Sequence, residues 1–229
     1  MSSLVFGVLY VVATPIGNLG DLTQRAAEVL RAADFVLAED TRHSRKLLAH
    51  LGIKKPLVSY HDHNEQQRQD VLLDRLKTGE HVALISDAGT PCIADPGSKI
   101  VSYAHDFQIE VVPLVGPSSI LLALMSSGMS GQNFAFTGYL PIDKGERNKV
   151  IRNLENLAKK TGQTQIFMET PYRNNQLLDT LKAQCNNKTR LCIAANITSK
   201  NEFIQTKTIE EWKQTKLDIH KQPSIFLLS

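Results

Sequence analysis

Three short turns combine glycine and proline with side chains that can bind a polar ligand. They are TPIGNLGD at 14–21, SDAGTPCIADPG at 86–97 and VGPSS at 115–119. Glycine lets a backbone come close to a ligand, and proline fixes a turn without using a donor. Asp87 can accept hydrogen bonds from a ribose hydroxyl or an ammonium group. A lone turn of this kind is as often structural as functional, whereas three on successive strand ends favour a shared pocket.

Two common phosphate-binding motifs fit these turns poorly. GNLGD lacks the G-x-G-x-x-G spacing of a dinucleotide fingerprint, and it also lacks the lysine of a P-loop. The amides of Ser118 and Ser119 stand at an expected helix start, where they can meet a polar ligand group. The pattern therefore indicates a ligand held by strand-end turns rather than by either motif.

The elements that position these turns alternate between strand and helix in the first half of the chain. Apolar runs predict strands, and amphipathic or capped segments predict helices. The expected strands are 4–13, 34–38, 81–86 and 110–115, and the expected helices follow Asp21, span about 41–51 and 64–79, and start at Pro117. This rhythm predicts a mostly parallel sheet with helices on both faces, in which ligands bind at the carboxyl ends of the strands.

The pattern changes after Gly131. Strands are expected at 133–140, 164–169, 190–196, 202–207 and 224–228, with helices near 145–160 and 173–184. The closer spacing of the strands predicts a mixed sheet. We therefore expect an α/β protein of two domains, 1–130 and 131–229, with the boundary in GMSGQN at about 129–133.

Composition is that of an ordinary globular chain. Of the 229 residues, 42% are hydrophobic and 21% are charged, and the net charge of +3 permits an anionic partner without requiring one. Three cysteines without a C-x-x-C pair indicate reduced thiols in the cytoplasm rather than a disulfide framework or a zinc site. The apolar opening is too short to span a bilayer and lacks the features of a signal peptide, so we expect a buried strand and no membrane.

Seven motifs occur in a fixed order along the chain. They are ATPIGNLGDLT, AEDTRHSRKLL, SYHDHNE, SDAGTPCIADPG, PLVGPSS, GYLP and METPYR. Together they resemble the small-subunit ribosomal RNA methyltransferases of the tetrapyrrole methylase superfamily, from about residue 8 to the end of the chain. The resemblance implies a two-domain α/β fold, a homodimer, S-adenosyl-L-methionine as cofactor in the cleft between the domains, and 2′-O-methylation of a cytidine ribose in 16S rRNA of the 30S subunit.

The same resemblance implies which residues contact the cofactor. They lie in the three turns, in GYLP and near a strand end of the second domain. The set is Pro15, Ile16, Asp87, Gly89, Thr90, Pro91, Ser118, Ser119, Tyr139, Leu140 and Ala195. The turn at 86–97 would then bend sharply so that a nucleoside and an amino-acid end can lie against backbone.

Methyl transfer to a ribose hydroxyl gains from a base, because that hydroxyl is a poor nucleophile. The candidates are Glu39, Asp40, Arg42, Asp62, His63, Glu65 and Glu169. Several of them have a structural alternative. Glu39 and Asp40 can cap a helix and pair with Arg42, and Glu169 can pair with Arg173 within its loop. His61 and His63 share a strand face, but no third metal ligand is evident from the spacing, so we expect no metal site. Arg42, Arg45 and Lys46 form either a solvated helix face or a patch that positions phosphates, which the resemblance favours.

The second domain departs from the pattern of these relatives. AANITSK stands at 194–200 where R-E-L-T-K is usual, KQP at 221–223 replaces K-G-E, and ETPYR at 169–173 replaces E-S-P-H-R. Two alternatives to rRNA methylation therefore stay open. One is a superfamily methyltransferase that acts on a small molecule such as a tetrapyrrole, against which the EDTRHSRK and H-x-H-N-E segments count. The other is a catalytically silent protein that binds RNA or the ribosome.

Overall fold

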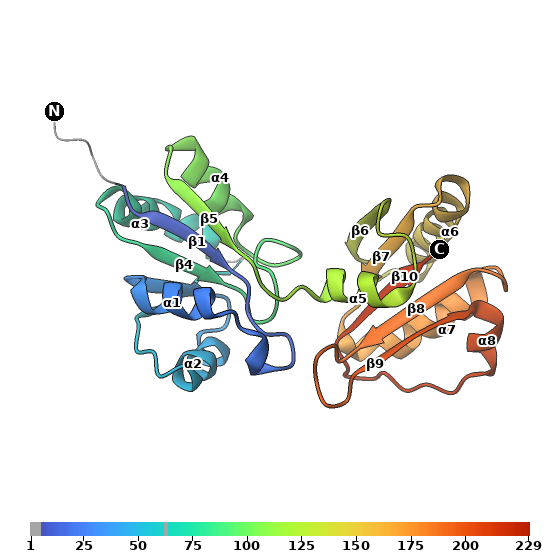
Figure 1. The fold of residues 1–229 in the computed structure, drawn as a ribbon. Coiled ribbons are helices and arrows are strands. Elements are labelled where there is room, and N and C mark those ends of the chain that lie inside the picture. Colours follow the sequence, from blue (N-terminus) through green and yellow to red (C-terminus); the bar gives the residue numbers. More distant parts are fainter. Residues whose placement is uncertain (1–5, 62–63) are drawn as a thin grey trace. The chain divides into compact units, whose positions relative to one another are not determined.

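The computed structural model describes residues 6–61 and 64–229, which form two compact units that divide between Ser118 and Ser119 (Figure 1). The division falls one helix before the boundary expected at 129–133. Helix α5 (Ser119–Ser127) accounts for the difference, because it contacts β8, β9 and β10 of the second unit.

The first unit is a five-stranded sheet in the order β3-β2-β4-β1-β5, in which every neighbouring pair is parallel. Its elements are β1 (Val8–Val12), α1 (Gln24–Ala32), β2 (Phe35–Ala38), α2 (Thr41–His50), β3 (Leu57–Ser59), α3 (Glu65–Lys77), β4 (Val82–Ile85), α4 (Ser98–Asp106) and β5 (Glu110–Leu114). The predicted alternation is confirmed. The short strand β3 and helix α4 were missing from the sequence-based set of elements.

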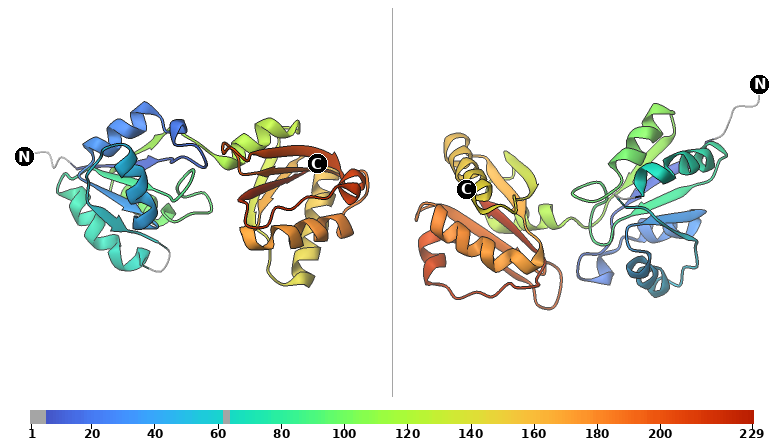
Figure 2. Two further views of the ribbon diagram at one scale, coloured as in Figure 1. Left: turned by 90° about the horizontal axis from the view of Figure 1, so that it is seen from below. Right: turned by 180° about the vertical axis from the view of Figure 1, so that it is seen from behind.

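Alternation along β2 explains why helices cover both faces of this sheet. Phe35 and Leu37 belong to a buried cluster with residues of α3 and α4, whereas Val36 and Ala38 belong to another with α1 and α2. All four are fully buried, as expected for a strand enclosed on both sides. Figure 2 shows the two pairs of helices on opposite sides of the sheet.

The start of α1 differs from the expectation. Thr23 is the N-cap, and its side chain accepts a hydrogen bond from the Ala26 amide. Asp21 instead ends a 3₁₀ turn, η1 (Leu19–Asp21), which Asn18 caps by accepting from the Gly20 amide. The turn places two residues between Asp21 and the helix, so that Thr23 occupies the capping position.

The second unit is a mixed sheet in the order β6-β7-β10-β8-β9. Its elements are α5, β6 (Phe134–Tyr139), α6 (Lys144–Thr161), β7 (Thr164–Met168), η2 (Pro171–Arg173), α7 (Asn174–Gln184), β8 (Arg190–Ala195), β9 (Phe203–Thr208), α8 (Ile209–Gln214) and β10 (Ser224–Leu228). Strands β6 and β7 are parallel, and the other pairs are antiparallel. The expected mixed sheet is confirmed, and α8 is an addition to the predicted helices.

One large apolar cluster joins α6, α7 and α8 to one face of this sheet. Trp212 of α8 is fully buried there, and its indole Nε1 donates to the Leu191 carbonyl at 2.8 Å. Helix α5 lies on the opposite face from α7 (Figure 2). No helix within residues 6–61 and 64–229 is long and apolar enough to cross a membrane.

Candidate functional site

The carboxyl ends of all five strands of the first unit meet at one edge of its sheet, because every neighbouring pair is parallel. This edge carries each of the three glycine- and proline-rich turns, together with Glu39 and Asp40 after β2. We call it the strand-end edge. The expectation that the turns would be neighbours is therefore met within this unit.

Backbone pairing joins the first two turns. Thr14 and Gly89 form an isolated antiparallel bridge, in which each amide donates to the other's carbonyl at 2.8 and 3.0 Å. The Thr14 hydroxyl donates to the Ser86 carbonyl at 3.1 Å, and the Ser86 hydroxyl donates to the Gly89 carbonyl at 3.2 Å. Thr14 and Ser86 are both buried. Four hydrogen bonds thus hold the turns in one arrangement, and sequence reasoning missed these two hydroxyls.

Gly89 is required at this crossing by geometry. Its φ is +85°, and a Cβ would lie 3.2 Å from Cγ2 of Ile16, a residue of the first turn. The third turn is equally tight, since a Cβ on Gly116 would lie 2.7 Å from the Cβ of Ala13. The Thr90 hydroxyl donates to the Pro117 carbonyl at 3.1 Å and so joins the second turn to the third. These glycines serve first to bring the turns together.

The rest of the second turn has unusual backbone conformations. Cys92 and Ala94 have positive φ values of 68° and 57°, and Gly97 has a φ of +129°. Such values are uncommon for residues with a Cβ. Pro91 is buried, whereas Ile93 and Ala94 are exposed. The loop is therefore anchored at its base and open at its tip.

Asp87 connects the second turn to the end of β2. Its Oδ1 accepts a hydrogen bond from the Asp40 amide at 3.0 Å. The side chain is half-buried, and in the part of the chain that the structure describes no hydrogen bond uses Oδ2. One oxygen thus fixes the fold of the edge, and the other is available to accept from a ligand.

Asp40 is already committed to local structure. It is the N-cap of α2, and its carboxylate accepts from the Arg42 amide and from the Arg42 guanidinium at 2.8 to 3.1 Å. These hydrogen bonds lower the pKa of Asp40 to about 2. The same side-chain hydrogen bond raises the pKa of Arg42. A carboxylate with so low a pKa is a weak proton acceptor at neutral pH.

A small cavity of about 30 Å³ lies beneath this edge. Its lining residues are Thr14, Pro15, Leu19, His43, Ser44, Leu47, Ser86 and Asp87. The hydroxyl of Ser44 is buried without a hydrogen-bond partner among the described residues. The cavity has room for water but not for a nucleoside. His43 and Ser44 were absent from the predicted site residues.

The second unit has a comparable edge. Strands β6, β7 and β8 run in the same direction, because β10 is antiparallel to both β7 and β8. These three strands therefore end at one edge of the sheet, which carries Tyr139, Glu169 and Ala195. Tyr139 is exposed, while Leu140 and Ala195 are buried, and the contact of these three residues with a cofactor stays a prediction.

Glu169 forms an ion pair within its own loop. Its Oε1 accepts from the Arg173 guanidinium at 2.6 Å and from the Thr170 amide at 2.7 Å. The side chain is buried, and Oε2 has no hydrogen-bond partner in the described residues. The hydrogen bond to Glu169 raises the pKa of Arg173. The structural alternative for this pair is thus present, and its contact with substrate stays a prediction.

The segment that departs from the relatives' pattern has its own contacts. Asn196 follows β8 with a φ of 51°, and its Nδ2 donates to Gln222 Oε1 at 2.7 Å. The Gln222 carbonyl in turn accepts from the buried side chain of Asn174 at 2.6 Å. A hydrogen bond between two side-chain amides therefore links segment 194–200 to segment 221–223, and both segments depart from the sequence pattern of the relatives.

Three candidates come from the segment of the sequence that leads into α3. Asp62 and His63 lie outside the described residues. Glu65 is the first residue of α3, after the N-cap position Asn64. The Asn64 side chain makes no capping hydrogen bond to the helix and instead accepts from the His61 amide at 2.9 Å. The roles of His63 and Glu65 stay predictions.

Comparison with known proteins accords with this arrangement. The family of tetrapyrrole (corrin/porphyrin) methylases matches residues 8–213. A Haemophilus influenzae protein named ribosomal RNA small subunit methyltransferase I is 43% identical over 93% of this chain and 74% of its own length. A protein of the same name from Synechocystis is 42% identical over 89% of this chain and 72% of its own.

Solved structures show the same fold at lower sequence identity. A diphthine synthase has a TM-score of 0.74 at 16% identity, covering 97% of this chain and 89% of its own. The uroporphyrin-III C-methyltransferase from Thermus thermophilus, complexed with S-adenosyl homocysteine, has a TM-score of 0.62 at 18% identity and covers 97% of both chains. The chain therefore belongs to the tetrapyrrole methylase family and is an S-adenosylmethionine-dependent methyltransferase.

Proposed function

We propose that this protein methylates the 2′-hydroxyl of a cytidine ribose in 16S rRNA. One geometric observation carries the proposal. The Asp40 amide donates to Asp87 at 3.0 Å, so that the turn expected to bind the cofactor adjoins the N-cap residue of the cationic helix α2. RNA held along this helix would thus end beside the cofactor. Relatives named for small-subunit ribosomal RNA support the choice of substrate.

The residues of the strand-end edge suit S-adenosylmethionine. Asp87 Oδ2 can accept from a hydroxyl or ammonium group, and the buried crossing of Thr14 and Gly89 holds Asp87 beside the first turn. Pro15 and Thr90 are partly exposed beside it. When bound, the cofactor supplies a methyl group that its sulfonium already activates. The protein's task is then to align the hydroxyl and exclude water.

We assign proton acceptance to Glu39. The hydroxyl oxygen forms its bond to the methyl carbon as the sulfur–carbon bond breaks, and the hydroxyl proton must pass to a base. Asp40 is poorly suited, because its two oxygens bind Arg42 and its pKa is about 2. Glu39 precedes it at the same strand end and is half-buried. Asp40 and Arg42 then act as positioning residues for α2.

The test is methyl transfer from labelled S-adenosylmethionine to 30S subunits that lack the modification, with a porphyrinogen as a parallel acceptor. Label in 16S rRNA and none in the porphyrinogen supports the proposal. Label in the porphyrinogen alone would favour a small-molecule enzyme. If neither acceptor is labelled while the cofactor binds, the result would favour a catalytically silent protein that binds RNA or the ribosome. We further propose a cytoplasmic homodimer, which mass measurement in solution would test.

A further inference from the structure

The positive charge of the chain is concentrated in one segment. From Thr41 to His61 there are five lysines and arginines and no acidic residue. The other 21 Lys and Arg face 23 Asp and Glu, so the remainder of the chain carries a net charge of −2. The whole excess that gives the chain its +3 thus lies on α2 and the loop that follows it. Such a concentration is typical of a surface that binds an anionic polymer.

A cavity of about 430 Å³ opens at the far end of this segment. Its lining residues are Arg45, Leu48, Ala49, Gly52, Ile53, Lys54, Lys55 and Leu57. Leu48 and Ile53 are buried and give it an apolar floor, while Arg45 and Lys54 are exposed at its rim. The volume falls within the range of about 300–1,000 Å³ that is typical of ligand pockets. We call it the α2 pocket.

The cations of the α2 pocket are not neutralised by the protein. In the part of the chain that the structure describes, Arg45, Lys54 and Lys55 have no ion pair and no side-chain hydrogen bond. By contrast, Arg42, at the other end of the helix, is paired with Asp40. A pocket with an apolar floor and unpaired cations at its rim suits a planar base with phosphates on either side.

Helix α2 joins this pocket to the strand-end edge. Arg42, Arg45, Lys46 and Ala49 follow the i, i+3, i+4, i+7 spacing of one helix face, and all four are exposed. The ten residues of α2 span roughly 15 Å at about 1.5 Å each, and the pocket begins at Arg45, in the middle of the helix, and extends past its end. A single RNA strand of a few nucleotides can follow this face from one end to the other.

We propose that the α2 pocket holds one unstacked base of the substrate RNA, with its flanking phosphates on Lys54, Lys55 and Arg45. This inference rests on the proposed function for the identity of the RNA. The pocket would anchor a nucleotide at a distance from the methylated ribose and thereby set which ribose reaches the strand-end edge. It is a binding site without a part in the methyl transfer itself.

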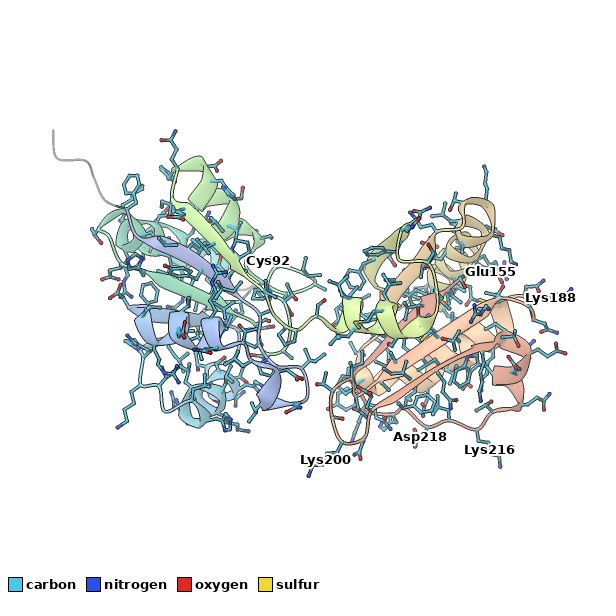
Figure 3. The ribbon with its side chains drawn as sticks, in the orientation of Figure 1. Cys92, Glu155, Lys188, Lys200, Lys216 and Asp218 are labelled. Atoms are coloured by element: carbon cyan, nitrogen blue, oxygen red, sulfur yellow. The ribbon has the colours of Figure 1, made fainter. Side chains whose placement is uncertain are left out.

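Two variants test the charge and the shape of the pocket separately. The double variant Lys54→Gln/Lys55→Gln removes two rim cations, and Ala49→Phe fills the pocket without changing charge. Lys188→Gln/Lys216→Gln is the matched control, since both lysines are exposed and point outward from the second unit (Figure 3), and neither forms an ion pair or a side-chain hydrogen bond with described residues. Affinity for unmodified 30S subunits and for protein-free 16S rRNA is measured between about 50 and 200 mM salt.

The proposal predicts different losses for the two variants. The lysine variant should lower the slope of log affinity against log salt by roughly 1.4, about 0.7 for each lost contact with single-stranded RNA. Ala49→Phe should weaken RNA binding about fivefold or more, since one stacked base contributes at least about 1 kcal/mol. The slope of log affinity against log salt should be unchanged in this variant. The control should match the wild type in both. Cofactor affinity, measured by calorimetry, should be unchanged in every variant and serves as the check on folding.

The possible failures are distinguishable. If both variants bind RNA like the wild type while the wild type methylates 16S rRNA, the pocket proposal is wrong and the proposed function stands. If Ala49→Phe alone has no effect, the pocket holds no base and the proposal is equally overturned. Losses seen with 30S subunits but not with protein-free rRNA would identify a ribosomal protein as the occupant. If the wild type labels no RNA but the variants still lose RNA affinity, the proposed function fails and the pocket stands.

Discussion

Asp87 is expected to do two tasks with its two oxygens, and two substitutions separate them. Asp87→Asn keeps an oxygen that can accept from the Asp40 amide, the bond that is 3.0 Å long in the wild type. It replaces Oδ2 by an NH₂ group, which presents donors where a ligand hydroxyl or ammonium needs an acceptor. Asp87→Ala removes both oxygens. The first variant should therefore lose cofactor binding alone, and the second should also lose stability.

The magnitudes follow from the kind of bond that is lost. A hydrogen bond to a charged group contributes about 1.5–3 kcal/mol, so the cofactor dissociation constant should rise roughly 10- to 150-fold in both variants. Leaving the part-buried Asp40 amide without an acceptor should cost about 1–2 kcal/mol of unfolding free energy in Asp87→Ala. Asp87→Asn should unfold within about 0.5 kcal/mol of the wild type.

Isothermal calorimetry with S-adenosylmethionine and urea unfolding measure the two quantities independently. Wild-type cofactor affinity in Asp87→Asn would refute the assignment of Oδ2 to the ligand. Equal destabilisation by both substitutions would show that the charge, rather than the acceptor for the Asp40 amide, supports the strand-end edge. Either result would require a different account of how the turn at 86–97 binds its ligand.

Three further predictions concern the base, the turn crossing and the second unit. Glu39→Gln should lower kcat roughly 10²- to 10⁴-fold with cofactor affinity nearly unchanged, as single-turnover methyl transfer and calorimetry would show, and a collapse of cofactor binding would place Glu39 in the pocket or the fold. Gly89→Ala should destabilise the first unit by about 1–2 kcal/mol in urea unfolding, because its φ is +85° and the new Cβ would meet Ile16; wild-type stability would contradict this. Burial opposes the ionisation of Glu155, but bonds from Thr189, the Asn186 amide and Lys159 outweigh it and lower the pKa of Glu155. The carboxylate of Glu155 therefore stabilises the fold above its ordinary pKa of 4.5, and this stabilisation is lost as pH falls below that value. In Glu155→Gln the free energy of unfolding, measured at a series of acidic pH values, should therefore fall less steeply with decreasing pH than in the wild type.

Much of the fold was predictable from local pattern. Runs of four apolar residues, FVLA in β2 and VALI in β4, predict strands that are covered on both faces, and the structure buries all eight. The three-residue strand β3 has no such run, because all its residues are half-buried at the sheet edge. Helix α4 follows the irregular turn at 86–97 and begins at Ser98 behind Gly97, without a side-chain cap to mark its start.

The site was predictable in its location but not in its internal contacts. Glycine, proline and Asp87 mark the second turn as unusual in the sequence. The bridge from Thr14 to Gly89 depends on strands β1 and β4 being neighbours, and local pattern does not give the order of strands in a sheet. The pairing of Asn196 with Gln222 likewise joins segments that are distant in the sequence. The α2 pocket was not predictable from the sequence, because Lys54 and Lys55 look there like residues of an ordinary solvated loop. Only the fold brings them beside Arg45.

The central claim is methylation of a ribose hydroxyl in RNA, and the chemistry of the labelled product tests it most directly. After transfer from labelled S-adenosylmethionine to unmodified 30S subunits, the 16S rRNA is digested with alkali. A 2′-O-methyl group removes the nucleophile on which alkaline cleavage depends, so the account predicts label in one alkali-resistant dinucleotide that begins with cytidine. Label in mononucleotides would mean methylation of a base, and an absence of label from the RNA would mean a different acceptor; either result would contradict the account.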